Sequence, residues 1–439
     1  MMSKNAKRKI LTAAVLCVCT NLWANPVWAV EVKINSWEQF EQLKENGDFS
    51  GGGTGTINKP QIDGEVSKDN NTVTVNVQNN NTALVGYSIA AGMGNGNTLI
   101  IENGVFGEKD GNDNYSKSSV YGAADGTVAE NNTVIIKNGI FYQDVYGGEA
   151  GGTGAQAIDN DVYIYGGVIE GNVSGGWLTS GDIAKDNYVY ITNQAKVKTV
   201  YGGHSWKNTS NNTVEITGEA NITNAYAGYS TGSGNVENNT VLIGNNSTIT
   251  GNLYGGYSAT GVTIGNKAIV KENAETFGTW VMGAYSPSNS ANNNKVEILG
   301  GNVDSNIAGG YGNLANGNSV LLSSGVIGTK YVYGGYGTNE ANNNIITLTN
   351  NVDVGNSYLY GSNKNAENTQ GNTLIIDAWK SNNAGGNVVA DIQRFNNITF
   401  KGLEWENGGI ALNITNTNTY GALYNTTVDV NNLTLANDK

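Results

Sequence analysis

The sequence predicts an all-β protein built as a parallel β-helix, in which short strands coil repeatedly around one long axis. Three observations support this. A block of about 27 residues recurs roughly ten times between residues 97 and 376, apolar residues alternate with period two inside each copy, and no helical periodicity occurs in the repeats. A constant period of this size indicates units that contact only their neighbours. We therefore expect one elongated domain from the 439 residues.

Each copy of the block has two fixed points. The first is an Asn in front of a short alternating run, as in residues 132–136, and the second is a Val-Tyr-Gly-Gly segment, as in residues 200–203. A second alternating pair often lies between them, and clusters of Asn, Gly, Ser and Asp mark the turns. We expect three short strands per coil, with the repeats spanning residues 61–377.

The recurring Asn predicts a second kind of regularity. Parallel coils stack about 4.8 Å apart, so equivalent residues lie above one another. Buried Asn side chains in such an array can bond to each other along the stack. The alternative interpretation is that Asn is only a good residue for turns and strand starts. The positions concerned are Asn97, Asn132, Asn160, Asn187, Asn212, Asn239, Asn266, Asn294, Asn318, Asn344 and Asn372.

Residues 1–29 are predicted to form a secretory signal peptide. Four basic residues within 4–9 precede a mostly apolar run over 10–18, and Val-Trp-Ala at 27–29 offers a cleavage site. The apolar run is too short to span a membrane. Both cysteines lie inside it, so the mature chain can form no disulfide and no thiolate metal site.

The charge of the chain limits its partners. Loss of the four basic residues of the signal peptide leaves 20 positive and 37 negative residues, a net charge of −17. This balance argues against nucleic acids and anionic membranes as partners.

A stack of coils needs caps at its ends, because its first and last strands would otherwise be open to further pairing. Residues 30–60 are predicted to form the N-terminal cap, with Ser36 and Gln39 as a capping box for a short helix over about 36–45. The repeat fades after Ile376, and we interpret residues 378–439 as a closing region of different geometry.

The signal peptide, the Cys-free acidic chain and the repeats together resemble autotransporter passenger domains of Gram-negative-type bacteria. The Asn-x-Val-x-Ile and Val-Tyr-Gly-Gly repeats are similar to those of large surface adhesins in that group, over residues 30–439. The resemblance implies a right-handed parallel β-helix, export to the cell surface, outer membrane or extracellular space, and adhesion to host-cell or biofilm glycans or proteins. It also implies that residues 378–439 help to nucleate folding, as an autochaperone does. The sequence up to Lys439 shows no C-terminal translocator barrel, so the expectation is either a truncated gene product or export that relies on another protein. The expected partners are export machinery and, in the second case, a separate outer-membrane barrel.

Two aromatic columns surround the small pair of each repeat. In a plain alternating strand, positions three apart face opposite sides, so one column would line the interior and the other the surface; a turn at Gly-Gly would spoil that parity. The column directly after the small pair, here called the second column, could bind a ligand such as a sugar. Its residues are Trp177, Tyr229, Tyr257, Tyr285, Tyr311 and Tyr336, with His204 in the same register. The other interpretation is that both columns are structural. The first column is Tyr121, Tyr146, Tyr201, Tyr226, Tyr254, Tyr333 and Tyr360.

No catalytic set stands out, and we expect a protein that is not an enzyme and has no cofactor. The best acidic cluster includes Asp110 and Asp113, which make a weak Ca²⁺ candidate or, in the alternative, a solvated loop. His204 is the only histidine, and its place in a Tyr column of the repeat predicts a packing role. Three functions remain: an adhesin-like surface protein, a carbohydrate-active β-helix enzyme of the lyase or hydrolase type, and a purely structural stalk.

Overall fold

The structure is a computed structural model that describes most of residues 30–402 and short pieces beyond them. The predicted signal peptide and the two Ca²⁺ candidates, Asp110 and Asp113, lie outside the described residues. The full set outside the description is 1–29, 51–55, 63–64, 79–82, 110–117, 329, 364, 383–385, 403–411, 416–422, 424–425, 427 and 430–439.

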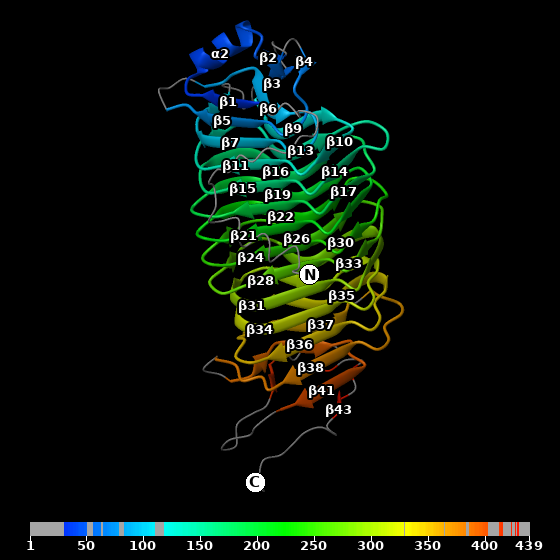
Figure 1. Ribbon diagram of the computed structural model, residues 1–439. Coiled ribbons are helices and arrows are strands. Elements are labelled where there is room, and N and C mark those ends of the chain that lie inside the picture. The colour runs from blue at the N-terminus through cyan, green and yellow to red at the C-terminus, as the bar shows by residue number, and fades with distance from the viewer. Residues whose placement is uncertain are drawn as a thin grey trace, which may run out of the picture.

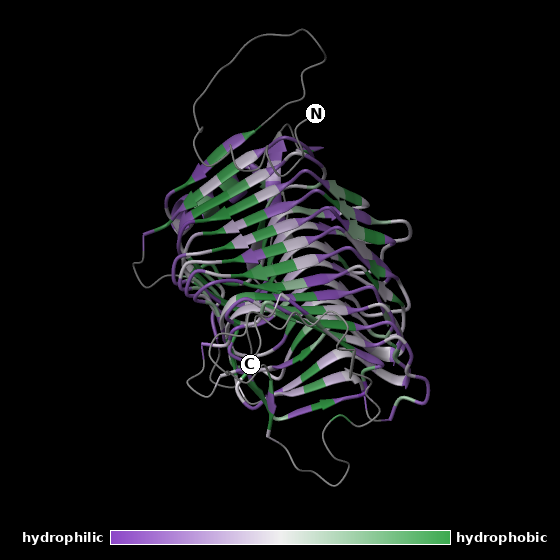
Figure 2. Ribbon diagram, turned by 90° about the horizontal axis from the view of Figure 1, so that it is seen from below, coloured by the Kyte–Doolittle hydropathy of each residue, from purple (hydrophilic) through white to green (hydrophobic). Residues whose placement is uncertain are grey.

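The described chain is an all-β parallel solenoid of about 12 turns with about 27 residues per turn, which confirms the predicted fold class (Figure 1). Equivalent residues of successive turns pair in register: Val134 lies opposite Val162, and Val162 lies opposite Val189. Apolar and polar residues alternate along the strands, as seen down the axis in Figure 2. The inward side chains form one apolar core that runs from Ile34 to Phe400.

The first stack of strands contains the short alternating run that follows each repeated Asn. Its side chains point alternately outward and inward, as in Thr213–Ile216, where Val214 and Ile216 are fully buried. It consists of β1 (Glu31–Ile34), β5 (Thr72–Asn76), β7 (Thr98–Asn103), β11 (Thr133–Ile136), β15 (Asp161–Ile164), β18 (Tyr188–Ile191), β21 (Thr213–Ile216), β24 (Thr240–Ile243), β28 (Lys267–Val270), β31 (Lys295–Val303), β34 (Ser319–Ile327), β36 (Ile345–Thr349), β38 (Thr373–Asp377), β41 (Asn397–Lys401) and β43 (Val428–Asp429).

The second stack contains the Val-Tyr-Gly-Gly segments. It consists of β3 (Thr56–Ile62), β6 (Tyr87–Gly92), β9 (Val120–Gly126), β13 (Val145–Ala150), β16 (Val168–Leu178), β19 (Lys196–Ser205), β22 (Asn221–Ser230), β26 (Leu253–Ser258), β30 (Trp280–Asn292), β32 (Asn306–Ala308), β33 (Tyr311–Leu314), β35 (Tyr331–Glu340), β37 (Tyr358–Ser362) and β40 (Asp391–Gln393). In some turns the alternating pair before it is a separate strand, namely β8 (Val105–Phe106), β12 (Ile140–Phe141), β25 (Thr248–Ile249) and β29 (Glu275–Thr276).

A third stack precedes the repeated Asn and differs from the prediction. In β16, β19 and β22 the two later predicted strands are continuous, and the additional strand lies before the Asn instead. Each of its members has one inward residue, in most cases a small one such as Ala184 or Thr209, so the sequence carries no alternating apolar pattern there. The members are β10 (Val128–Glu130), β14 (Gln156–Ile158), β17 (Ile183–Lys185), β20 (Asn208–Ser210), β23 (Val236–Glu237) and β27 (Thr263–Ile264).

The corner between the third and first stacks has a left-handed backbone. The residue directly before the repeated Asn has φ of 54° at Asp159, 58° at Asp186 and 56° at Asn211. Gly265 and Gly317 occupy the same place in other turns, with φ of 68° and 66°. Only Gly, Asn and Asp adopt this region readily, which explains why Asn-Asn, Asp-Asn and Gly-Asn pairs open the repeats.

The repeated Asn forms a continuous buried ladder, which confirms the predicted side-chain stacking. Asn212 donates from its backbone N and from Nδ2 to Oδ1 of Asn239, at 2.9 and 2.8 Å, and its own Oδ1 accepts the same two bonds from Asn187. Nδ2 also donates to the carbonyl of Ala184 in the third stack, at 3.0 Å. The ladder reaches from Asn71 to Asn396, beyond both ends of the repeat seen in the sequence.

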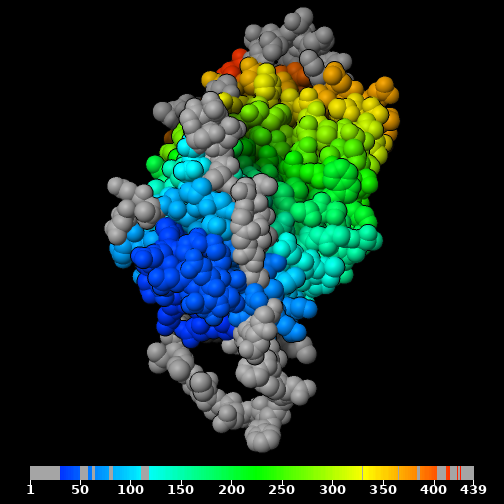
Figure 3. All heavy atoms as spheres, turned by 90° about the horizontal axis from the view of Figure 1, so that it is seen from above, coloured from blue at the N-terminus to red at the C-terminus, as the bar shows by residue number. Residues whose placement is uncertain are grey.

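The N-terminal cap agrees with the prediction. α2 (Trp37–Glu45) has Ser36 as its N-cap, and the Ser36 hydroxyl accepts from the backbone N of Gln39 at 3.0 Å. Phe40 is fully buried and Trp37 packs edge-on against Phe106, so the helix covers the core at the first turn. Figure 3 shows this dark-blue end of the rod from above. Two short strands, β2 (Phe49–Ser50) and β4 (Glu65–Val66), pair antiparallel with β3.

The stacking continues beyond residue 377, where the sequence repeat fades. β41 pairs in parallel with β38, and Asn396 accepts the last described bond of the ladder. Trp379 and Phe395 fill the core there, with the indole N–H of Trp379 bonded to the carbonyl of Val352. A separate parallel pair joins β39 (Val388–Val389) to β42 (Asn413–Ile414).

Candidate functional site

Both aromatic columns face outward, and they meet on one side of the rod. In β19, Val200 and Ser205 point inward and are fully buried, whereas Tyr201 and His204 lie between them on the outer side. The rings of Tyr201 and His204 contact each other edge-on, 5.3 Å apart. The alternation is therefore broken at the small pair, so the division into one inner and one outer column is wrong and the alternative, a parity spoiled at Gly-Gly, is confirmed. We call the combined surface the aromatic strip.

The small pair lies where there is no room for larger side chains. A Cβ on Gly202 would lie 2.5 Å from the carbonyl oxygen of Ala227 in the next turn. A Cβ on Gly203 would lie 2.6 Å from Nδ2 of Asn212, so the pair packs directly against the ladder. The ladder and the strip are thus two sides of one structural unit.

The second column of the strip is a stack of parallel rings. Tyr229 and Tyr257 lie 4.4 Å apart with 8° between their planes, and Tyr311 and Tyr336 lie 4.5 Å apart with 9° between theirs. The column runs in register through Trp177, His204, Tyr229, Tyr257, Tyr285, Tyr311 and Tyr336. Because each ring face is covered by its neighbour, the column presents ring edges and polar atoms to a ligand rather than free faces.

The first column lies deeper than the second. Tyr146 and Tyr254 are only 5 % and 6 % exposed, whereas Tyr229, Tyr257 and Tyr285 are half-buried. Burial raises the pKa of the Tyr254 hydroxyl, with a further contribution from the neighbouring tyrosines. Register places Ser174, Met282 and Ala308 in this column where Tyr is missing. The first column therefore supports the second from beneath.

His204 is a buried neutral member of the second column. It stacks on Trp177 at 3.7 Å and on Tyr229 at 5.2 Å, and its Nδ1 has no hydrogen-bond partner. Burial lowers the pKa of His204 to about 4. The packing role expected from its repeat position agrees with this environment.

The buried His204 predicts a loss of stability in acid. Since its folded-state pKa of about 4 is below the ordinary 6.5, the unfolded chain binds more protons between these pH values. The free energy of unfolding should therefore fall by up to about 3 kcal/mol as pH drops from 6.5 to 4. We expect His204→Phe, which keeps the stack, to remove this loss in thermal unfolding measured at pH 4.5 and 7. An equal acid dependence in the variant would contradict the assignment.

An acidic pocket lies at the N-terminal head of the strip. Glu149 pairs in register with Trp177, so it occupies the position of an aromatic residue one turn earlier. The pocket has a volume of about 230 Å³ and is lined by Asp125, Gly126, Glu149, Ala150, Gly151 and Thr179. Burial, then repulsion by Asp125 and Asp144, raises the pKa of Glu149 to about 7. Sequence reasoning missed this residue, although its place at the start of an aromatic column was visible in the repeat.

The other charged groups around the pocket have partners. Asp125 forms an ion pair with Lys59, which is only 7 % exposed. Asp144 accepts from the hydroxyl of Tyr146 at 2.7 Å and from the backbone N of Asn172 at 2.6 Å. The carboxylate of Glu149 forms no hydrogen bond or ion pair with any described residue.

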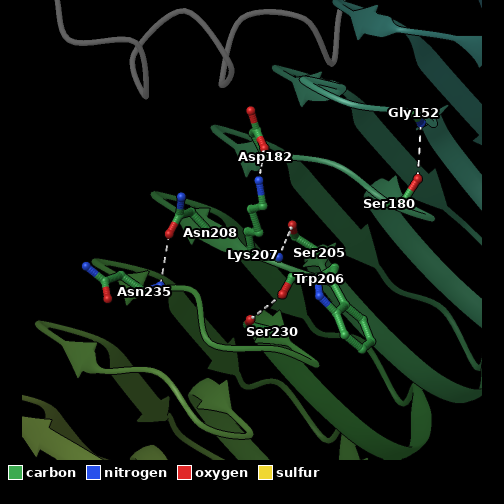
Figure 4. Close-up of polar contacts among 9 residues, drawn as sticks. All are labelled: Gly152, Ser180, Asp182, Ser205, Trp206, Lys207, Asn208, Ser230 and Asn235. Atoms are coloured by element: carbon green, nitrogen blue, oxygen red, sulfur yellow. Dashed lines mark hydrogen bonds and ion pairs between the residues drawn. The ribbon is translucent and has the colours of Figure 1, made fainter.

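The loops that follow the strip expose one large aromatic ring. Trp206 is 58 % exposed and comes two residues after His204. Figure 4 shows its indole pointing away from two neighbouring polar contacts, the ion pair of Lys207 with Asp182, at 2.5 Å, and the bond from Asn235 N to Asn208 Oδ1, at 2.9 Å. Unlike the stacked rings, Trp206 has a ring that solvent can reach.

Comparisons with known sequences and structures give no functional information about the site. No known protein family matches the chain, and neither a curated protein nor a solved structure shows significant similarity to it. Among the described residues, no group of three or more His, Cys, Asp and Glu side chains is arranged to hold a metal ion. Within the same residues, no helix has the length and apolar content needed to cross a bilayer.

Proposed function

We propose that this chain is an adhesin-like bacterial surface protein, exported as the passenger of an autotransporter-type system, which attaches to glycans along the aromatic strip. The observation that carries the proposal is the strip itself: a continuous outward aromatic surface over successive turns from Trp177 to Tyr336. Outward-facing aromatic residues that gather over several successive turns are typical of binding sites. The Cys-free mature chain and its predicted signal peptide support export.

A linear polymer is the ligand that fits the shape of the strip. The strip follows the rod axis and repeats once per turn, so identical groups recur at the strand spacing of about 4.8 Å. Ring edges offer apolar contact to C–H groups, while the tyrosine hydroxyls offer hydrogen bonds to sugar hydroxyls. Repetition along one chain also adds avidity without any strong single contact.

The proposal predicts separate effects on binding and stability. We expect Trp206→Ala to weaken binding of the purified protein to its best glycan by up to about tenfold, because one aromatic contact contributes about 0.5–1.5 kcal/mol. The same change should leave the thermal unfolding midpoint unchanged, since Trp206 is 58 % exposed. Tyr257→Ala should lower both quantities, because its ring is stacked on both faces.

A glycan array followed by titration with the best ligand provides the measurement. Ile345→Ala is the matched control, because Ile345 is 37 % exposed on the first stack, away from the strip. Variants that lose stability but bind normally would favour the structural stalk instead. Absence of glycan and host-cell binding by the unmodified protein would count against adhesion.

A second candidate function, a carbohydrate-active enzyme, is favoured by one observation. Glu149, with its pKa raised to about 7, lines the same pocket as Asp125, whose carboxylate is paired with Lys59. Glycoside hydrolases commonly use two carboxyl groups with different pKa values, one as acid and one as base or nucleophile. Release of reducing sugar that disappears in Glu149→Gln would support this function over adhesion.

A further inference from the structure

We propose that the acidic pocket at the head of the aromatic strip binds the protonated amine of an amino-sugar polymer, whose following units lie along the strip. This inference rests on the proposed glycan-binding function and specifies the ligand class. It starts from continuity: Glu149 and Trp177 are register partners, so the pocket and the second column form one surface.

The charges of the pocket select a cation. Three carboxylates, those of Asp125, Asp144 and Glu149, act on this region, and Lys59 supplies one positive charge that is already used by Asp125. A largely buried carboxylate without a partner is costly, and an ammonium group placed against it removes much of that cost. A neutral sugar would leave Glu149 unpaired.

The lining of the pocket favours an amino sugar over a lysine side chain. A lysine would need an apolar channel for its four-carbon stem. The pocket instead offers Thr179, two glycines and two carboxylates, which suit the hydroxyl groups of a sugar ring. Its volume of about 230 Å³ leaves room for one such ring, and the edge of Trp177 stands next in the column.

The test compares two oligomers of glucosamine type with the full protein by calorimetric titration. One is a de-N-acetylated hexamer with free amines, and the other is the fully N-acetylated hexamer. We expect the free-amine hexamer to bind at least tenfold more tightly, and Glu149→Gln to abolish most of that preference, as a charge-assisted contact of this kind requires.

Glu170→Gln is the matched control for charge. Glu170 lies in β16 and is exposed, so its removal should change affinity less than twofold. Equal binding of both hexamers, with no effect of Glu149→Gln, would overturn the inference while leaving glycan binding intact. Failure of both hexamers and of every other glycan would overturn the proposed function as well. A lysine-rich peptide that binds as tightly as the free-amine hexamer would contradict the sugar assignment.

A permanently charged, N-trimethylated hexamer separates the protein's titration from that of the ligand. The groups facing Glu149 are Asp125, Asp144, Lys59, Tyr121 and Tyr146. Affinity for this hexamer should rise about tenfold between pH 6 and 8 as Glu149 becomes charged, and the rise should be absent in Glu149→Gln. A flat profile for the unmodified protein would argue against Glu149 as the contact.

Discussion

Asn212→Ala is expected to lower the free energy of unfolding by about 3 kcal/mol or more, because it leaves several buried polar groups unpaired. The backbone N and Nδ2 of Asn187 lose their acceptor, and the carbonyl of Ala184 loses one donor. Both side chains are fully buried, so water cannot replace these bonds without entering the core.

Hydrogen exchange measures this effect best, since a stack of repeats can open locally rather than in one step. Amides of β18, β21 and β24 should exchange faster in Asn212→Ala than in the unmodified protein. Asn221→Ala is the control: Asn221 lies on the same turn but is exposed, and its loss should cost less than about 0.5 kcal/mol. Equal protection in the two variants would show that the ladder is not needed for stability.

Gly278→Ala is expected to be the most disruptive single-methyl change outside the ladder. A Cβ at this position would lie 1.4 Å from the carbonyl oxygen of Gly251 in the preceding turn, so the two turns must move apart. Overpacking of this kind costs about 3 kcal/mol. Because Gly278 leads into β30, the rings of Tyr254 and Tyr285 should also lose their contact.

Gly244→Ala tests whether the effect is steric. Its new Cβ would meet only Lys271, whose Cβ lies 3.2 Å away, and this contact needs a shift of only a few tenths of an ångström. We expect a lower chemical-denaturation midpoint and altered near-ultraviolet circular dichroism for Gly278→Ala, and neither for Gly244→Ala. Similar midpoints for the two variants would mean that the turns adjust their spacing freely.

The sequence by itself determined the features that follow from the 27-residue repeat. Asn212 and its equivalents recur at the turn length, so the sequence predicted both the parallel solenoid and the ladder of bonds. The helix that covers the first turn was equally visible, because Ser36 and Gln39 form a local capping pattern over three residues. Because each turn contacts only its neighbours, the residue pattern of one turn predicts the structure of the whole stack.

Only the tertiary structure decided where the aromatic rings face and what lies at their head. The requirement for a glycine at 202 arises from the carbonyl of Ala227, one turn away, and alternation along the strand could not decide that Tyr201 and His204 share a side. The third stack was missed for a related reason: its single small inward residues have no period of their own. Glu149 gained its raised pKa from burial and from repulsion by carboxylates that include Asp125 of the preceding turn. The physical reason is common to all three: corner angles, burial and charge repulsion arise between turns, whereas the sequence pattern records only the order of residues within them.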